Sequence, residues 1–208
     1  MNKQNSRKKS LKYLLVLLLL ISVGYAAIAT TLKINGTATV KSSKWDVYWE
    51  PTSVSVTSGS VTTTAEDAAQ VTNTTTKDEV AYNIALNEPG DFYEFTVDAV
   101  NNGSIDAMIA EGGVTNKVYS DAECTHEITL PDYLRYTVTY ADTGAPAIAQ
   151  YQTLAKKSGS TPTTKKFKVR VEYRTDIDKD TLNTSTDQTL YFRFNANYVQ
   201  ADSNAITD

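Results

Sequence analysis

Hydrophobic and polar residues alternate with a period of two through most of the chain after residue 40. In the stretch KKFKVRVEYR, Phe167, Val169 and Val171 share one face, and charged residues share the other. The same alternation recurs in KWDVYW, EVAYNIAL, FYEFTVDAV, YLRYTVTY and TLYFRFNANYV. Strands with one apolar and one polar face are typical of antiparallel sheets with one wet side. Since two such sheets pack face to face, the pattern predicts an all-β fold, an antiparallel β-sandwich.

Two segments depart from this alternation. Residues 144–159, GAPAIAQYQTLAKKSG, place Ile148, Tyr151 and Ala155 on one helical stripe, and Gly159 suits the end of a helix. We therefore expect one short helix beside the sandwich. Residues 57–78 are rich in Ser and Thr and poor in apolar residues, which predicts a long exposed connection.

The N-terminal region has a third pattern. A basic head, an apolar core at residues 13–23 and small residues up to Ala29 form the layout of a secretory signal peptide. We expect cleavage in the region of Ala27, Ala29 and Thr30. The alternative is a retained anchor, although the 17 residues from 13 to 29 are at the lower limit for a membrane span.

These patterns divide the chain into three parts. Residues 1–29 are the predicted signal peptide, which we expect to be helical. Residues 30–200 form one sandwich domain, and residues 201–208 form a flexible tail. We expect the chain to contact the membrane only through the signal segment, before cleavage.

Charge and cysteine content narrow the class of protein. Removing residues 1–29 takes away five of the 20 basic residues and none of the 24 acidic ones, which leaves 15 basic and 24 acidic residues and a net charge of −9. An acidic chain lacks the basic surface that holds phosphate backbones, so we expect no nucleic-acid partner. Cys124 is the only cysteine, so no disulfide forms within the chain.

The sequence offers little for catalysis. His126 is the only histidine, and the surrounding HEITL lacks the second histidine of a helical zinc-protease site. The sequence contains no glycine-rich phosphate loop and no nucleophile elbow. We therefore expect a protein that is not an enzyme and needs no cofactor.

One acidic loop, DIDKDTLNTSTD, has a spacing that partly matches a calcium-binding loop. Thr181 stands where that loop needs glycine, and its last position carries aspartate rather than glutamate. We interpret the segment as a polar hairpin loop and expect no tight metal site. The weak calcium candidates are Asp176, Asp178, Asp180 and Asp187.

A more distinctive block spans residues 87–109, NEPGDFYEFTVDAVNNGSIDAMI. A Pro-Gly-Asp turn precedes an alternating strand, and an Asn-Asn-Gly-Ser turn follows it. Here the chain resembles the TasA/camelysin family of exported bacterial surface proteins. The segments VGYAAIATTL, LKINGTATV and TLYFRFNANYVQ are similar to the family's signal end, first mature strand and closing strand.

The resemblance implies a fold and a function. The expected fold is a jelly-roll-type sandwich, and the expected function is that of a subunit of extracellular fibres in a biofilm matrix or on the cell surface. The implied partners are further copies of the chain, a SipW-type signal peptidase and other matrix proteins. Camelysin relatives also imply a metallopeptidase, but this sequence lacks a recognisable zinc motif.

The segment after the cleavage region is itself competent to form a strand. One face of this predicted assembly strand, residues 30–40, carries Leu32, Ile34, Gly36, Ala38 and Val40. Such a strand can be donated to the open edge of a neighbour's sheet. Alternatively, it pairs within its own domain. The alternative hypothesis for the function is a monomeric adhesin or glycan-binding module, based on Trp45, Trp49 and the 13 tyrosines.

Overall fold

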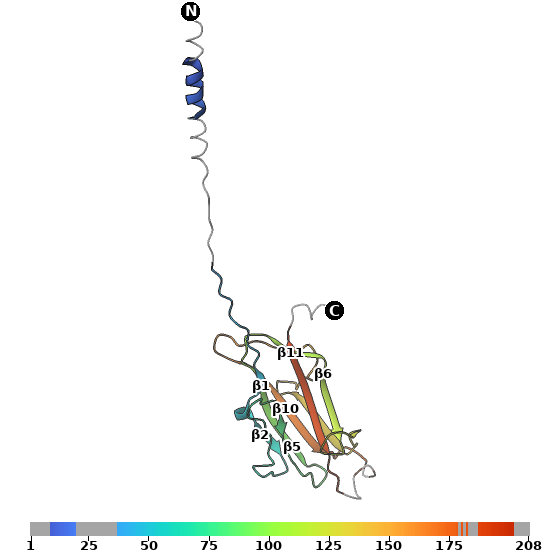
Figure 1. The fold of residues 1–208 in the computed structure, drawn as a ribbon. Coiled ribbons are helices and arrows are strands. Elements are labelled where there is room, and N and C mark those ends of the chain that lie inside the picture. The colour runs from blue at the N-terminus through green and yellow to red at the C-terminus, as the bar shows by residue number, and fades with distance from the viewer. Residues whose placement is uncertain (1–8, 20–36, 179, 181, 183–186, 202–208) are drawn as a thin grey trace, which may run out of the picture. The chain divides into compact units, whose positions relative to one another are not determined.

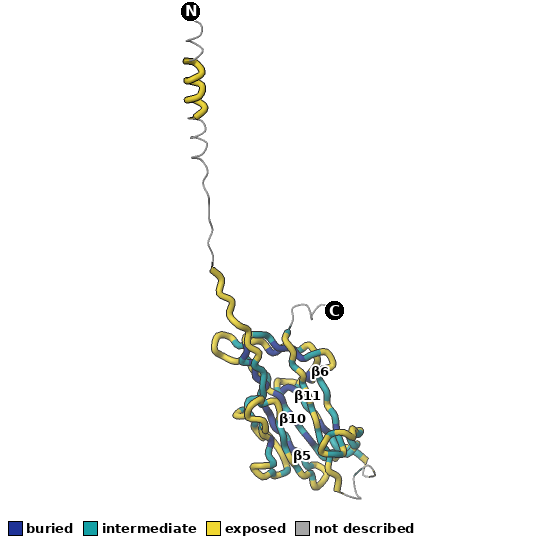
Figure 2. The backbone as a smooth tube through the Cα atoms, in the orientation of Figure 1, coloured by how far each residue is buried: buried dark blue, intermediate teal, exposed yellow. Residues whose placement is uncertain are grey.

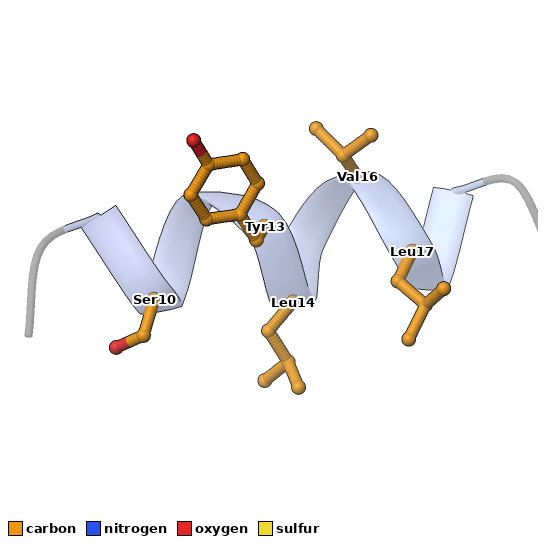
Figure 3. A pocket seen from close by; sticks show the side chains of 5 residues that line it. All are labelled: Ser10, Tyr13, Leu14, Val16 and Leu17. Atoms are coloured by element: carbon orange, nitrogen blue, oxygen red, sulfur yellow. The ribbon is translucent and has the colours of Figure 1, made fainter.

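The structure, a computed structural model, describes residues 9–19, 37–178, 180, 182 and 187–201. The chain comprises two units, residues 1–41 and residues 42–208. In the first unit, residues 9–19 form a helix whose side chains are all exposed. Tyr13 and Val16 project from one side of it, and Leu14 and Leu17 project from the other (Figure 3). Within the described ranges, no helix is long and apolar enough to cross a membrane.

The second unit is an antiparallel β-sandwich, which confirms the predicted fold class (Figure 1). Its five-stranded sheet has the order β1-β5-β10-β8, with β2 also paired to β5. This sheet consists of β1 (Val47–Trp49), β2 (Ser55–Gly59), β5 (Phe92–Asn101), β8 (Leu134–Tyr140) and β10 (Thr163–Tyr173). A 3-10 turn, η1 (Pro51–Ser53), joins β1 to β2.

The four-stranded sheet is built around its longest strand, β6. It consists of β6 (Ala107–Tyr119), β7 (Glu127–Ile128), β9 (Thr153–Leu154) and β11 (Tyr191–Gln200). β11 pairs along one side of β6, while β7 and β9 pair with opposite ends of β6. A small third sheet pairs β3 (Gln70–Val71) with β4 (Val80–Ala81).

The core forms where the alternating apolar faces of the two sheets meet. On β5 and β10 the inward side chains are buried, namely Tyr93, Phe95, Val97, Phe167, Val169 and Val171. Phe167 lies at the centre of an aromatic group, with ring centroids 5.0 Å from Trp49 and 5.0 Å from Tyr140. Figure 2 shows the buried positions gathered along the central strands and the exposed ones along the loops. The inward faces predicted for these strands are therefore confirmed.

The helix predicted at residues 144–159 is wrong. All of these residues are described, and the segment is extended and irregular, with β9 near its end. Its backbone bonds to β6 instead of to itself: Tyr151 N donates to Ile109 O (2.8 Å), and Ile109 N donates to Gln152 O (3.0 Å). Ile148 and Leu154 are buried as a helix would also have buried them. Pairing along the edge of β6 thus buries these apolar residues without a helix. The tertiary contacts outweigh the weak local preference for helix.

The Ser/Thr-rich segment at residues 57–78, predicted as an exposed connection, is attached to the core. β2 occupies its first three residues, and one helical turn follows, in which Ala68 N donates to Thr64 O (3.0 Å). Ala69 is buried, and its N–H donates to the hydroxyl of Tyr93 (2.9 Å). This contact ties the connection to the core.

Candidate assembly edge

β11 lies at one edge of the four-stranded sheet, beside β6 (Figure 1). Its register with β6 runs from Tyr191↔Tyr119 to Gln200↔Ala107. In the part of the chain that the structure describes, no strand pairs with the other side of β11. Ten residues at about 3.3 Å each give this outer edge a length of about 33 Å.

The hydrogen bonds on the far side of β6 show which backbone groups of β11 face its outer edge. Ile109 uses both its N–H and its C=O to bond with residues 151 and 152, away from β11. Its register partner Tyr198 is therefore in a non-hydrogen-bonded pair, and the N–H and C=O of Tyr198 face the outer edge. Ala201 N donates to Asp106 O (2.8 Å), so the backbone groups of Ala201 face β6. Successive residues of a strand direct their backbone groups to opposite sides, so those of Gln200 face the outer edge.

The inward side chains of β11 are less buried than those of β5. Phe192, Phe194, Ala196 and Tyr198 pack against the core but are only partly buried. The Phe192 ring lies 4.7 Å from that of Tyr136 on β8, which places β11 over this edge of the five-stranded sheet. Burial and the neighbouring Tyr140 raise the pKa of Tyr198, so its hydroxyl stays neutral. Among the described strands β11 pairs with β6 alone, and its inward aromatic side chains are only partly buried.

The outer edge carries few of the features that keep edge strands from pairing. Proteins protect such edges with lysine, proline, bulges or very short strands. β11 contains no lysine and no proline, and Arg193 is its one charged residue. A bulge lies opposite, in β6, where the register shifts between Ala196 and Tyr198. Gly112 sits in this bulge at φ 61°, a left-handed conformation that glycine adopts without strain.

The predicted assembly strand is only partly described. Leu32, Ile34 and Gly36 lie outside the described residues, as do the cleavage residues Ala27, Ala29 and Thr30. Ala38 and Val40 are exposed, and residues 37–40 belong to no strand. Val40 has 92 % of its surface exposed. These last residues of the predicted strand are therefore not in a strand in the structure.

The aspartates of the calcium candidate are not grouped as metal ligands among the described residues. Asp176 is held by two arginines, with Arg135 Nη2 and Arg174 Nε each 2.9 Å from a carboxylate oxygen. The hydrogen bond from Arg174 is the main reason why the pKa of Asp176 falls to about 2. Asp178, Asp180 and Asp187 are described as well. Across the described ranges, no three His, Cys, Asp or Glu side chains are grouped to hold a metal ion.

His126 and Cys124 belong to an exposed turn before β7. Asp121 accepts hydrogen bonds from the backbone N–H of Thr125 (3.0 Å) and of His126 (2.7 Å). These bonds, with that from Thr125 the largest cause, lower the pKa of Asp121 to about 2. The His126 side chain is 80 % exposed, and Cys124 is partly exposed at φ 55°. The hydrogen bonds to the Asp121 carboxylate therefore stabilise the turn.

The Pro-Gly-Asp turn is held by a carboxylate. Asp91 accepts hydrogen bonds from the backbone N–H of Asn87 (2.8 Å) and Glu88 (3.1 Å), and from the hydroxyl of Ser60 (2.9 Å). The bond from Asn87 is the main cause of the lowered pKa of Asp91. Gly90 adopts φ 104°, which a side chain would strain. These residues fix the start of β5.

The Asn-Asn-Gly-Ser turn is fixed by a buried amide. Asn101 is fully buried, and its Nδ2 donates to the carbonyls of Ile105 (2.9 Å) and Leu154 (3.0 Å). Its Oδ1 accepts from Gly103 N (2.9 Å). A Cβ on Gly103 would lie 2.5 Å from the carbonyl oxygen of Lys44, so only glycine fits there. Both turns of the distinctive block therefore position strands rather than a reactive group.

The fold defines this protein as an antiparallel β-sandwich in which, among the described strands, the outer edge of β11 has no paired strand. Comparison with protein-family models, with curated proteins and with solved structures finds no match to the chain.

Proposed function

We propose that this protein is an exported structural subunit that assembles into extracellular fibres or a surface matrix by exchanging strands between copies. The outer edge of β11 carries the proposal. A strand added there would bond to the outward backbone groups of Tyr198 and Gln200. It would also cover Phe192 and Phe194, which their own domain leaves partly exposed.

Residues 30–40 of another copy are the proposed donor. This segment has eleven residues, and the acceptor edge has ten. Leu32, Ile34 and Val40 would be buried on one face, at roughly 1.5–3 kcal/mol for each large aliphatic side chain before the costs of association are subtracted. Residues 37–40 are exposed and belong to no strand, which supports the availability of this segment.

Export would control when assembly begins. The basic head and the exposed apolar helix at residues 9–19 support a role as a signal peptide. While this segment is attached, the donor strand is held beside the membrane. Cleavage near Ala27 or Ala29 by a signal peptidase would free the N-terminus. Fibres would then form outside the cell.

The test is negative-stain electron microscopy of the exported, processed chain. Wild type should form fibres, and Ile34→Asp should abolish them, because the variant places an unpaired charge in a buried interface. Thr37→Asp, on the polar face of the same strand, is the matched control and should form fibres normally.

Deletion of residues 30–40 separates assembly from folding. The deleted chain should remain a monomer with an unchanged β-sheet circular dichroism signal. If the deletion unfolds the domain, this strand belongs to its own sandwich and the proposed exchange is wrong.

A further inference from the structure

A shallow depression lies at the start of β1. Its volume is about 420 Å³, within the range of roughly 300–1,000 Å³ of small-molecule sites. Two turns border it, one at residues 75–77 and one at Asn102. The side chains that matter for its chemistry are Trp45, Asp46, Tyr48, Lys77 and Asn102.

Trp45 provides an apolar surface in this depression. The alternation along KWDVYW predicts that Trp45 points inward with Val47 and Trp49. Val47 and Trp49 do pack against the core, but Trp45 is 43 % exposed. Core packing therefore does not account for this indole, which presents a flat apolar face and one N–H donor to the depression.

Two polar side chains beside Trp45 are held in fixed orientations. The Oδ2 atom of Asp46 accepts hydrogen bonds from Lys44 Nζ (2.6 Å) and Asn102 Nδ2 (3.1 Å). The backbone N–H of Asn102 also donates to Asp46 O (2.9 Å), which ties the two segments together. A carboxylate has about four acceptor positions, so Asp46 retains capacity for the hydroxyls of a ligand.

The opposite border is a strained turn. Lys77 adopts φ 53°, an uncommon conformation for a residue with a side chain. Asn73 Oδ1 accepts from the N–H groups of Thr75 and Thr76 (both 3.0 Å), and Lys77 O accepts from Trp49 N (2.8 Å). This conformation holds the Lys77 ammonium 4.7 Å from the centre of the Tyr48 ring. The lining thus combines the Lys77 ammonium with the Asp46 carboxylate, and Lys44 pairs with that carboxylate from outside the lining.

We propose that this depression binds a neutral, β-linked glycan chain. A pyranose ring with equatorial hydroxyls presents a flat C–H face, which stacks on the exposed indole of Trp45. Its hydroxyls bond to the Asp46 carboxylate and the Asn102 amide. The Asp46 carboxylate, which the sugar hydroxyls must approach, repels a sugar carboxylate and so favours a neutral sugar. The site is separate from the β11 edge, and it goes beyond the proposed assembly function.

The test is an NMR titration of the full chain with a β-1,4-linked glucose hexasaccharide, followed through the two indole N–H signals. The chain is kept in a polyoxyethylene detergent, because sugar-headed detergents would compete. The Trp45 signal should shift while that of Trp49 stays. Trp45→Ala should weaken binding by roughly tenfold or more, and Trp45→Phe should retain most of it. Circular dichroism checks the fold of each variant.

Tyr151→Ala is the matched control, because Tyr151 is 44 % exposed and lies outside the depression. It should bind like wild type. An unshifted Trp45 signal at about 10 mM sugar, or equal binding by Trp45→Ala, would overturn the proposal. Tighter binding of an acidic galacturonate hexasaccharide, or of an unstructured peptide, would also overturn it.

Discussion

The two edges of the four-stranded sheet differ in how far the chain covers them. The outer side of β6 is met by β9 at one end and by β7 at the other. Between them, Ile109 bonds to residues 151 and 152, and Gly112 N donates to the side chain of Gln150 (3.0 Å). The outer side of β11 has no comparable partner among the described residues. One edge is thus closed by the domain itself, and the other remains available.

The same contrast appears in the side chains. β5 has neighbours on both sides, and its inward residues Tyr93 and Phe95 are 1 % and 2 % exposed. β11 has one neighbour among the described strands, and its inward residues Phe192 and Phe194 are only partly buried. Among the described strands, β11 therefore has outward backbone groups that pair with no strand and inward apolar side chains that are only partly buried. An added strand would supply both hydrogen-bond partners for the backbone and cover for the apolar side chains.

The largest effect should come from truncating the closed part of the core. Phe167→Ala should lower the free energy of unfolding by about 3–5 kcal/mol, because Phe167 is buried between Trp49 and Tyr140. Phe194→Ala should be clearly milder in the monomer, since Phe194 is partly exposed there. Urea denaturation of the monomer measures both values. Equal losses would show that the β11 side is as well packed as the centre.

A smaller effect should follow from a charge at the bare edge. Val199 on β11 is 38 % exposed, so Val199→Lys should leave the monomer's stability within about 0.5 kcal/mol of wild type. The lysine should slow fibre growth, because charged side chains on an edge strand disfavour pairing. Light scattering follows the growth rate.

The matched variant is Val56→Lys on β2, in the other sheet, where Val56 is 49 % exposed. It should polymerise at the wild-type rate. The same slowing in both variants would point to a general charge effect rather than to the β11 edge.

Much of the fold could be predicted from the sequence, and the reasons are local. Alternation over seven or more residues identified β5, β8, β10 and β11, since a pleated strand sends successive side chains to opposite faces. The segment at residues 144–159 was mistaken for a helix because its partner is β6, which is distant in sequence.

The candidate edge was harder to predict. The strand TLYFRFNANYV was recognised, but its place at the end of a sheet depends on how all the strands are ordered. The one local hint in this strand is that Arg193 is its single charged residue, since protected edge strands usually carry more charge. The exposed position of Trp45 could not be predicted either, because alternation places it inward. Here the turns at Lys77 and Asn102 decide how the chain enters β1.

Hydrogen exchange at β11 tests the central claim most directly. The amides of Tyr198 and Gln200 face the outer edge and should exchange readily in the monomer. In fibres they should exchange roughly tenfold more slowly or slower still, because a donated strand bonds to them. The Ile109 amide is the internal control, since it already donates to Gln152 O and should change little. If the Tyr198 and Gln200 amides exchange in fibres at the monomer rate, the outer edge of β11 is not the acceptor.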